Sequence, residues 1–543
     1  MNNTSLVIPK PVNEPVLSYA PGTPERARLQ AKLAELKQTQ LEIPAFIGGQ
    51  AVFTGNTETV SPPHEHQFVL GKVHNCGAVE VEKAITACRD ARREWMDMPW
   101  TDRAAIFLRA ATLLAGPWRE TINAATMLGQ SKNPHQAEID SACELIDFLR
   151  FNAYYMAQIY ADQPYSPSGI WNQLQYRPLE GFVLAVTPFN FTAIQGNLCA
   201  APAMMGNTVI WKPSTTAIYS AYYVYKLFEA AGLPAGVINM LPGFGPDIGD
   251  PAMASPEFAG LHFTGSTRTF NSMWQTIGSQ INTYRAYPRI VGETGGKDFI
   301  LAHPSANADE VATAIVRGGY EYQGQKCSAA SRVYVPKSLW PRIQAYTVAQ
   351  MAEIKVGSVE DFSNYMNAVI DRKSFDKLSG YIDRAKADSS VTVEYGASYD
   401  DSTGYFINPT LLRTEDPMYA TMCEELFGPV VTLYVYDDAK FDETVNLVNN
   451  TSPYALTGSI FARDRKVIRQ TMDNLVDAAG NFYINDKPTG AVVGQQPFGG
   501  ARGSGTNDKA GSYLNLIRWV SPRTIKENFS PPRHFGYDYL KSE

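Results

Sequence analysis

The stretch Gly292-Glu293-Thr294-Gly295-Gly296-Lys297 stands between two blocks of alternating strands and helices, and this alternation decides the fold. In the first block, short apolar runs alternate with helical stretches; the runs cover residues 182–186, 209–212, 237–241, 261–264 and 290–292. A helix over 217–231 ends at Gly232-Leu233-Pro234, a stop signal. Strands and helices that alternate at this spacing predict a parallel sheet covered on both faces.

The second block repeats the pattern and predicts a second α/β domain. We expect a strand over 299–302, a helix over 307–322 and further strands over 331–335, 427–436, 456–462 and 481–485. Upstream of the first block, the periodicity predicts helices over 24–40, 78–98, 101–116 and 137–160. A Pro/Ser/Gly-rich break at 163–169 precedes a partly alternating segment at 170–177, which indicates a hairpin or edge strand.

Composition and charge exclude several classes of protein. With 543 residues the chain needs more than one core, and 44% apolar with 19% charged residues is ordinary for a globular protein. A net charge of −7 without a long basic block argues against nucleic-acid or anionic-membrane binding. No apolar run approaches the roughly 20 residues of a membrane span. Residues 1–15 fit neither a signal peptide nor a transit peptide, so we expect a cytoplasmic protein, or a processed mitochondrial matrix protein.

The cysteines and histidines argue against disulfides and metal. The six cysteines are scattered without a CxxC pair, which favours free thiols in a reducing compartment. Only His64 and His66 form a close histidine pair, in a Pro-rich loop without further ligands at metal-binding spacing. We therefore expect no metal.

The segment Gln323-Gly324-Gln325-Lys326-Cys327-Ser328 and the upstream Glu293 suggest covalent catalysis in two stages. A thiolate is a strong nucleophile that can capture a carbonyl carbon, and a positioned carboxylate can activate water to hydrolyse a thioester. Asn190 follows a strand and could donate to an oxyanion together with the Cys327 amide. The alternatives are a buried cysteine, a solvated or ion-paired glutamate and a helix-capping asparagine.

A dinucleotide site is a further possibility at the edge of the first sheet. Phe263-Thr264-Gly265-Ser266-Thr267 follows a strand and precedes a helix, so that backbone amides there can hold a phosphate. Lys212, at the end of another strand, can reach a ribose or phosphate. The GxGxxG fingerprint is missing, and the glycine turn alone could be a mere connection.

Taken together, these motifs resemble the aldehyde dehydrogenase superfamily over residues 45–525. The matching stretches are Thr187-Pro188-Phe189-Asn190, Trp211-Lys212-Pro213-Ser214, Phe263-Thr264-Gly265-Ser266, Glu293-Thr294-Gly295-Gly296-Lys297, Gly324-Gln325-Lys326-Cys327, Glu424-Glu425-Leu426-Phe427-Gly428-Pro429 and Pro497-Phe498-Gly499-Gly500. Residues 144–152, 179–182, 479–487, 493–502 and 504–507 are similar to the Δ1-pyrroline-5-carboxylate dehydrogenase branch.

That resemblance implies NAD-dependent oxidation of L-glutamate γ-semialdehyde to L-glutamate, the second step of proline catabolism. It implies Cys327 as nucleophile, Glu293 as the base for deacylation and Asn190 with the Cys327 amide as oxyanion hole. Implied cofactor contacts are Thr187, Lys212, Ser214, Gly265, Ser266, Glu425 and Phe427. Implied substrate contacts are Glu144, Phe191, Ser328, Gly490, Ala491 and Phe498.

The resemblance also implies an aldehyde dehydrogenase-like α/β architecture. We expect a Rossmann-type NAD-binding domain over 1–162 and 178–296, a catalytic domain over 297–517 and an oligomerisation element over 163–177 and 518–543. The expected partners are a small-molecule substrate and a second copy of the chain in a homodimer or larger homo-oligomer.

Two positions depart from the family pattern, and two rival functions stay open. Thr215 stands where many members carry a ribose-binding glutamate, which weakens discrimination against NADP, and Ala491 stands where some relatives have serine. The first rival is an aldehyde dehydrogenase for another acidic semialdehyde, such as succinic semialdehyde. The second is a catalytically silent binding protein of the same fold.

Overall fold

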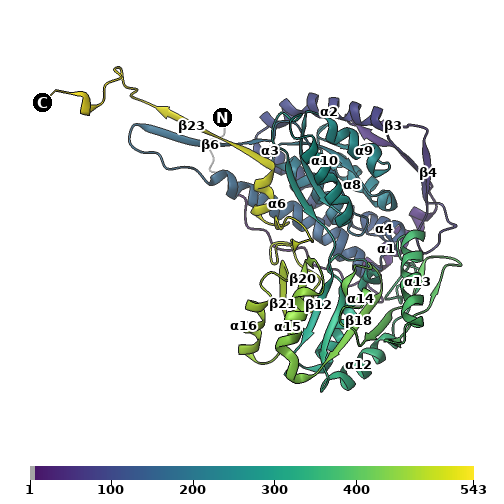
Figure 1. Ribbon diagram of the computed structural model, residues 1–543. Helices are drawn as coiled ribbons and strands as arrows, with labels where there is room; N and C mark the ends of the chain where they lie inside the picture. The colour runs from purple at the N-terminus through teal and green to yellow at the C-terminus, as the bar shows by residue number, and fades with distance from the viewer. Residues whose placement is uncertain (1–6, 543) are drawn as a thin grey trace.

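The computed structural model describes residues 7–542, which form two α/β lobes and a projecting two-stranded ribbon (Figure 1). The first lobe holds a seven-stranded sheet of order β11-β10-β7-β8-β9-β2-β3. Its strands are β2 (Ala45–Ile47), β3 (Gln50–Val52), β7 (Phe182–Val186), β8 (Thr208–Lys212), β9 (Ile238–Met240), β10 (Phe258–Thr264) and β11 (Arg289–Glu293). The five strands from β7 to β11 are parallel, as predicted, whereas β2 and β3 add antiparallel.

Helices cover both faces of this sheet because buried side chains alternate along its strands. Val183 and Ala185 join one core with α3 (Trp100–Ala115), α4 (Arg119–Gln130), α6 (Glu144–Ala161), α7 (Thr192–Met204) and α8 (Ile218–Ala230). Phe182 and Leu184 join the other with α2 (Ala78–Asp97), α9 (Gly245–Ala254) and α10 (Thr267–Ser279). The prediction of a sheet covered on both faces is confirmed.

The helix predicted over 137–160 is interrupted near its start. A π-helical turn over Glu138–Cys143 separates the short α5 (Pro134–Ala137) from α6. Such turns are common at functional sites because they redirect the side chains that follow. The helix predicted over 24–40 is α1 (Pro24–Lys37); it ends earlier, because β1 (Leu41–Ile43) begins a small sheet with β5 (Gly71–His74) and β4 (Thr57–Val60).

The second lobe holds a seven-stranded sheet of order β14-β17-β18-β13-β12-β20-β21. Its strands are β12 (Asp298–Ala302), β13 (Ala330–Pro336), β14 (Val391–Tyr395), β17 (Thr410–Thr414), β18 (Val430–Tyr436), β20 (Thr457–Phe461) and β21 (Asn481–Ile484). All pair in parallel except the edge strand β14. The main helices of this lobe are α11 (Ala308–Tyr320), α12 (Trp340–Ala352), α13 (Arg372–Ala387), α15 (Phe441–Asn450) and α16 (Arg465–Asn474).

The ribbon joins two segments that lie far apart in the sequence. The strand β6 (Ile170–Pro178) pairs antiparallel with β23 (Val520–Asn528) along its whole length, so the 170–177 segment is an edge strand. Figure 1 shows the ribbon and the C-terminal tail projecting away from both lobes. The tail exposes large aromatic side chains: Phe529, Phe535, Tyr537 and Tyr539.

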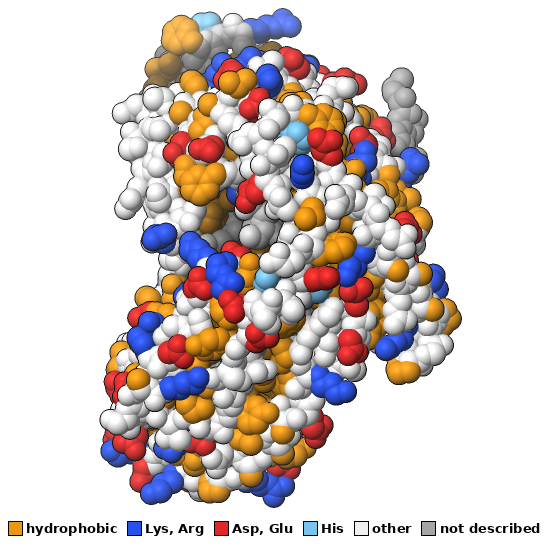
Figure 2. All heavy atoms as spheres, turned by 90° about the vertical axis from the view of Figure 1, so that its right-hand side faces the viewer, with side chains coloured by type: hydrophobic (Ala, Val, Ile, Leu, Met, Phe, Trp, Pro, Cys, Tyr) orange, Lys and Arg blue, Asp and Glu red, His pale blue; other side chains and the backbone are white. Residues whose placement is uncertain are grey.

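One face of the two lobes carries mixed charge (Figure 2). On the face shown in Figure 2, basic and acidic side chains are interspersed rather than gathered by sign. Within residues 7–542, no helix combines the length and the apolar character needed to cross a membrane.

Candidate active site

A cavity of about 410 Å³ collects the predicted nucleophile and the predicted substrate contacts. Its walls include Glu144, Phe191, Cys327, Ser328, Gly490, Ala491 and Phe498. These residues come from α6, from the loop after β7 and from three separate segments of the second half of the chain. The fold therefore places side chains that are up to several hundred residues apart around one space large enough for a small metabolite.

The loop that carries Cys327 is held in an unusual backbone conformation. Tyr322 and Gln323 adopt left-handed φ angles of 50° and 55°, which are uncommon for residues with side chains. The Gln323 side chain donates to the carbonyl oxygens of Ser131 and Ala368, both at 2.9 Å. Since a strained backbone persists only where its surroundings fix it, these buried contacts hold the loop beside the cavity.

Asn190 lies against this loop and is not a helix cap. Its Nδ2 donates to the carbonyl oxygen of Gln325 at 3.1 Å. The following helix begins at Thr192 with Phe191 in the capping position, so the capping alternative is wrong. An asparagine amide has two N–H donors, and the bond to Gln325 leaves the second available.

The thiol of Cys327 and the carboxyl of Glu293 both have raised pKa values. Burial raises the pKa of Cys327 well above its usual value, and the carboxylates of Asp298, Glu425 and Glu293 raise it further. Burial likewise raises the pKa of Glu293, although the Gly500 N–H donates to its carboxylate at 3.0 Å. Glu293, at the end of β11, is not among the residues that line the cavity, although it contributes to the raised pKa of Cys327.

One end of the cavity offers donors without protein partners. The backbone N–H groups of Gly490 and Ala491 donate to no protein acceptor within residues 7–542. Gly490 has a left-handed φ of +94°, and Ser328 shares a 2.8 Å hydrogen bond with the hydroxyl of Thr489. Unpaired N–H groups beside a hydroxyl form a site suited to a carboxylate.

Charged residues that the sequence analysis missed also face this cavity. Lys326 and Lys487 line it and share the carboxylate of Glu321, at 3.4 Å and 3.3 Å. Asp140, which also lines the cavity, pairs with buried Lys132 at 2.6 Å. Lys326 is next to Cys327 in the sequence, and Lys487 ends the segment 479–487 that resembles the family. Neither lysine stands at a motif spacing that would predict a place in the cavity.

Lys132 and Asp140 also affect two predicted substrate contacts. The Lys132 ammonium lies 4.3 Å from the centre of the Phe191 ring, a cation–π contact that fixes the ring. Burial raises the pKa of Glu144 well above its usual value, and Asp140 adds to the effect.

Five of the seven predicted cofactor residues lie at the carboxyl ends of the neighbouring strands β10, β7 and β8, whereas Glu425 and Phe427 precede β18. Lys212 ends β8, and its ammonium makes no hydrogen bond or ion pair within the described chain; burial lowers its pKa to about 8. Ser266 caps α10, where it accepts from the Thr269 N–H at 3.2 Å behind Gly265. A helix N-terminus and an unpaired cation at one sheet edge suit a pyrophosphate and ribose.

The other four cofactor candidates are tied into the structure around this edge. Thr187 Oγ1 accepts from the Trp211 indole at 2.9 Å, and the Ser214 hydroxyl lies 3.1 Å from that of Thr216. Glu425 accepts from the Gly296 N–H at 2.9 Å, and Phe427 packs edge-on against Phe189 with ring centres 5.6 Å apart. The second lobe thus contacts the loop after β11, at Gly296, and the loop after β7, at Phe189.

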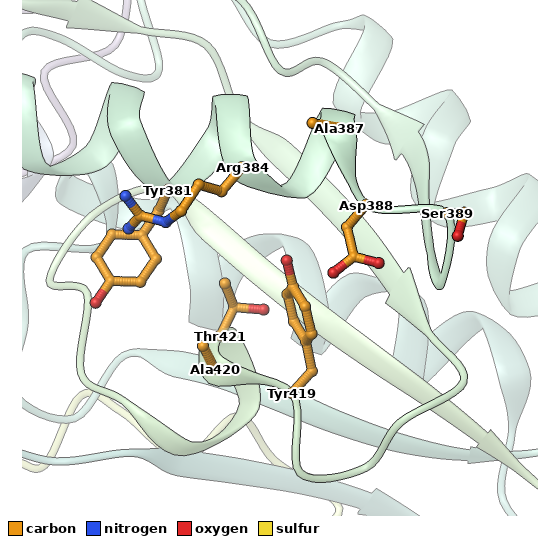
Figure 3. Close-up of a pocket in the computed structure, with 8 residues that line it drawn as sticks. All are labelled: Tyr381, Arg384, Ala387, Asp388, Ser389, Tyr419, Ala420 and Thr421. Atoms are coloured by element: carbon orange, nitrogen blue, oxygen red, sulfur yellow. The ribbon is translucent and has the colours of Figure 1, made fainter.

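Another hollow, of about 550 Å³, contains none of the predicted residues. It lies between the end of α13 and Tyr419–Thr421 (Figure 3). In Figure 3 the Arg384 guanidinium lies beside Tyr381, whose ring centre is 4.2 Å away. None of its lining residues has a role implied by the resemblance, so the cavity at Cys327 is the better candidate.

Within the described residues, the two histidines of the close pair have different hydrogen-bond partners, and the cysteines are unpaired. His64 Nδ1 lies 3.2 Å from the Ser131 hydroxyl, whereas His66 Nε2 lies 2.9 Å from the Asp401 carbonyl oxygen. Within residues 7–542, no group of three or more His, Cys, Asp or Glu side chains could hold a metal ion. All six cysteines, which lie in this described part, are free thiols.

Comparisons with known proteins agree with the geometry. The family model described as the aldehyde dehydrogenase family matches residues 53–523. A delta-1-pyrroline-5-carboxylate dehydrogenase of Agaricus bisporus is 52% identical over 533 residues, which cover 98% of this chain and 97% of the relative. A mitochondrial delta-1-pyrroline-5-carboxylate dehydrogenase of Dictyostelium discoideum is 49% identical over 536 residues, covering 98% and 96%.

Solved structures give the same result. The crystal structure of a delta-pyrroline-5-carboxylate dehydrogenase from Mycobacterium tuberculosis, bound with NAD, superposes with a TM-score of 0.96. It is 51% identical in sequence, and the match covers 100% of both chains.

Proposed function

The chain belongs to the aldehyde dehydrogenase family, and we propose that it oxidises L-glutamate γ-semialdehyde, the open form of Δ1-pyrroline-5-carboxylate, to L-glutamate with NAD. The observation that carries the proposal is the cavity that Cys327 lines together with Ser328, Gly490 and Ala491. This reaction is the second step of proline catabolism.

The substrate lies along the cavity with its amino-acid end at one set of residues and its aldehyde end at Cys327. Its α-carboxylate meets the free N–H groups of Gly490 and Ala491 and the Ser328 hydroxyl. Its α-amino group faces Glu144. Burial raises the pKa of this carboxyl group, and the positive charge of the bound ammonium lowers it again, so that Glu144 is ionised in the complex. Phe191 and Phe498 flank the aliphatic part, which brings the aldehyde carbon to Cys327.

Covalent capture is the first chemical stage. The Cys327 thiolate adds to the aldehyde carbon, and the oxyanion that forms accepts from the free N–H of Asn190 and from the Cys327 amide. The residues at the edge of the first sheet fit NAD, because Lys212 has no hydrogen-bond or ion-pair partner among residues 7–542 and the N-terminus of α10 lies at the same edge. NAD, when bound there, supplies the hydride acceptor.

Deacylation is the second stage. Loss of hydride from the captured aldehyde leaves a thioester on Cys327. Glu293, once it leaves the Gly500 N–H and is deprotonated, takes a proton from water, and the resulting hydroxide attacks the thioester carbon. The bond to sulfur breaks, glutamate leaves and Cys327 is regenerated.

The experiment that tests this function compares substrates under one set of conditions. NADH formation is measured with Δ1-pyrroline-5-carboxylate, succinic semialdehyde and propionaldehyde. We expect kcat/KM for Δ1-pyrroline-5-carboxylate to exceed that for propionaldehyde by roughly 10²-fold or more, because the unpaired donors need an anion. A higher kcat/KM for succinic semialdehyde would favour the rival semialdehyde activity, and no turnover at all would favour a binding protein.

The assembly we propose is a homodimer or larger homo-oligomer that uses the β6–β23 ribbon and the tail. The support is the exposure of Phe529, Phe535 and Tyr537, at 63%, 82% and 74%, on a projecting segment. A stable protein rarely leaves such an aromatic cluster in water. Sedimentation at micromolar concentration should give at least a dimer; a monomer would contradict the proposal.

For the compartment we propose the cytoplasm, with the mitochondrial matrix as the alternative. The six free thiols suit either of these reducing compartments. The Dictyostelium relative is named as mitochondrial, which keeps the alternative open.

A further inference from the structure

An N-terminal strap, residues 12–19, forms part of the wall of the substrate cavity. Asn13, Glu14 and Val16 line the cavity together with Cys327 and Gly490. The strap precedes α1 and has no regular secondary structure. It also lies outside residues 53–523, the part that the family as a whole shares. The strap therefore reaches the site from outside the part of the chain that the family model matches.

Asn13 connects two sides of the cavity through one side-chain amide. Its Nδ2 donates to the Asp147 carboxylate on α6 at 2.8 Å and to the Val493 carbonyl oxygen at 2.7 Å. Its Oδ1 accepts from the Gln495 side chain at 2.9 Å. The Asn13 side chain thus hydrogen-bonds to α6 and to the loop that contains Val493 and Gln495 at the same time.

The 489–496 loop, which presents the free N–H groups, is held at its two ends. At one end Thr489 bonds to Ser328, and at the other Asn13 bonds to Val493 and Gln495. Val493 also packs against Phe148 and Phe151 of α6. Gly490 and Ala491 lie between the two attachments, so the position of the second attachment affects where their N–H groups point.

The strap itself is fixed, which Asn13 needs if it is to position a loop. Glu14 forms ion pairs with Arg119 and Arg150, both at 2.7 Å, and its N–H donates to Asp147 at 2.8 Å. The Leu17 N–H and the Tyr19 hydroxyl donate to Glu138 of the π-helical turn at 2.9 Å and 2.8 Å. Asn13 is therefore supported from the helical side of the cavity.

We propose that Asn13 is a positioning residue for substrate selectivity, acting through the 489–496 loop. By tying Val493 and Gln495 to Asp147, it keeps the N–H groups of Gly490 and Ala491 directed at the α-carboxylate. The inference rests on the proposed function, since it concerns the same substrate. An aldehyde without a carboxylate makes no use of the loop and does not depend on Asn13.

The test uses the full-length protein and three variants. Asn13→Ala removes all three bonds, Gln495→Ala removes one, and Val12→Ala is the matched control, because Val12 is 82% exposed and does not line the cavity. For each, kcat and KM are measured with Δ1-pyrroline-5-carboxylate and propionaldehyde, and NAD affinity is measured by titration.

We expect Asn13→Ala to lower kcat/KM for Δ1-pyrroline-5-carboxylate about tenfold, mainly through KM, since the bonds lost are individually modest. Propionaldehyde kinetics and NAD affinity should change less than about twofold, a split that general destabilisation does not produce. Gln495→Ala should show a smaller change in the same direction, and Val12→Ala none. If Asn13→Ala fails to fold and so loses NAD affinity, the test rests on Gln495→Ala, whose kcat/KM should fall for Δ1-pyrroline-5-carboxylate and not for propionaldehyde.

An equal loss with both aldehydes, or a selectivity like that of Val12→Ala, would overturn the proposal and leave the function intact. A wild type without preference for Δ1-pyrroline-5-carboxylate would instead remove the proposed function, and the inference with it.

Discussion

The carboxylate of Glu293 accepts a hydrogen bond from the backbone N–H of Gly500 at 3.0 Å, across 207 positions of sequence. This contact holds the carboxylate at the end of β11, and Glu293 is not among the residues that line the cavity of Cys327. The carboxylate nevertheless acts on Cys327, since it contributes to the raised pKa of the thiol. In the proposed two-stage reaction this base is needed only after the thioester has formed.

Glu293→Gln should therefore slow the second stage and spare the first. A glutamine preserves the shape and can still accept from Gly500, but it cannot deprotonate water. Rapid mixing should show a burst of NADH followed by steady turnover reduced roughly 10²-fold or more. Loss of the burst together with the steady rate would mean that Glu293 acts earlier or holds the site together.

The reactivity of Cys327 should rise with pH. Burial, Asp298, Glu425 and Glu293 raise the pKa of the thiol, so below that pKa the thiolate is a minor form that grows as pH increases. The rate of alkylation by iodoacetamide, measured by mass spectrometry of the Cys327 peptide, should increase steadily between about pH 6 and about pH 9. A constant rate across this range would contradict the assigned environment.

Cofactor choice should be less strict than in relatives with a ribose-binding glutamate. Thr215 begins the short turn after Lys212 and offers no charge to repel a 2′-phosphate. Thr215→Glu should lower kcat/KM with NADP and leave that with NAD nearly unchanged. A wild type that uses NADP as well as NAD or better would contradict the preference for NAD.

Gly490→Val should damage selectivity more than turnover. Gly490 has a φ of +94°, which a branched residue tolerates poorly, and an added Cβ would lie 3.0 Å from the Lys487 ammonium. The shifted loop should lower kcat/KM for Δ1-pyrroline-5-carboxylate far more than for propionaldehyde. Equal losses for the two aldehydes would show that the loop does not bind the α-carboxylate.

Most strands of both lobes could be predicted because their signals are local, although β14 and β17 of the second sheet were missed. Residues 182–186 form an apolar run that is buried on both faces of the sheet, and the structure ends β7 at the same residues. In contrast, β2 and β3 have three residues each around Gly48-Gly49, too few to show a period, and both were missed. Hence the sheet was expected to be parallel throughout.

The site could be predicted only where a motif marks it. The resemblance supplied Cys327, Ser328 and Gly490, and the fold brings them to one cavity. Asn13 belongs to no motif, and its partners Asp147 and Val493 lie 134 and 480 positions away. No local pattern encodes such contacts. The family, fold class and activity predicted from the sequence are confirmed by the comparisons, whereas the residue roles and domain limits stay predictions.

The most direct test of the central claim is a product balance with Δ1-pyrroline-5-carboxylate labelled with ¹³C. NADH is followed by absorbance and glutamate by NMR, in the wild type and in Cys327→Ala, with NAD affinity measured in both. We expect one labelled glutamate for each NADH in the wild type, and neither product in Cys327→Ala despite nearly intact NAD binding. Glutamate formation by Cys327→Ala, or NADH without glutamate in the wild type, would contradict covalent oxidation of this substrate at Cys327.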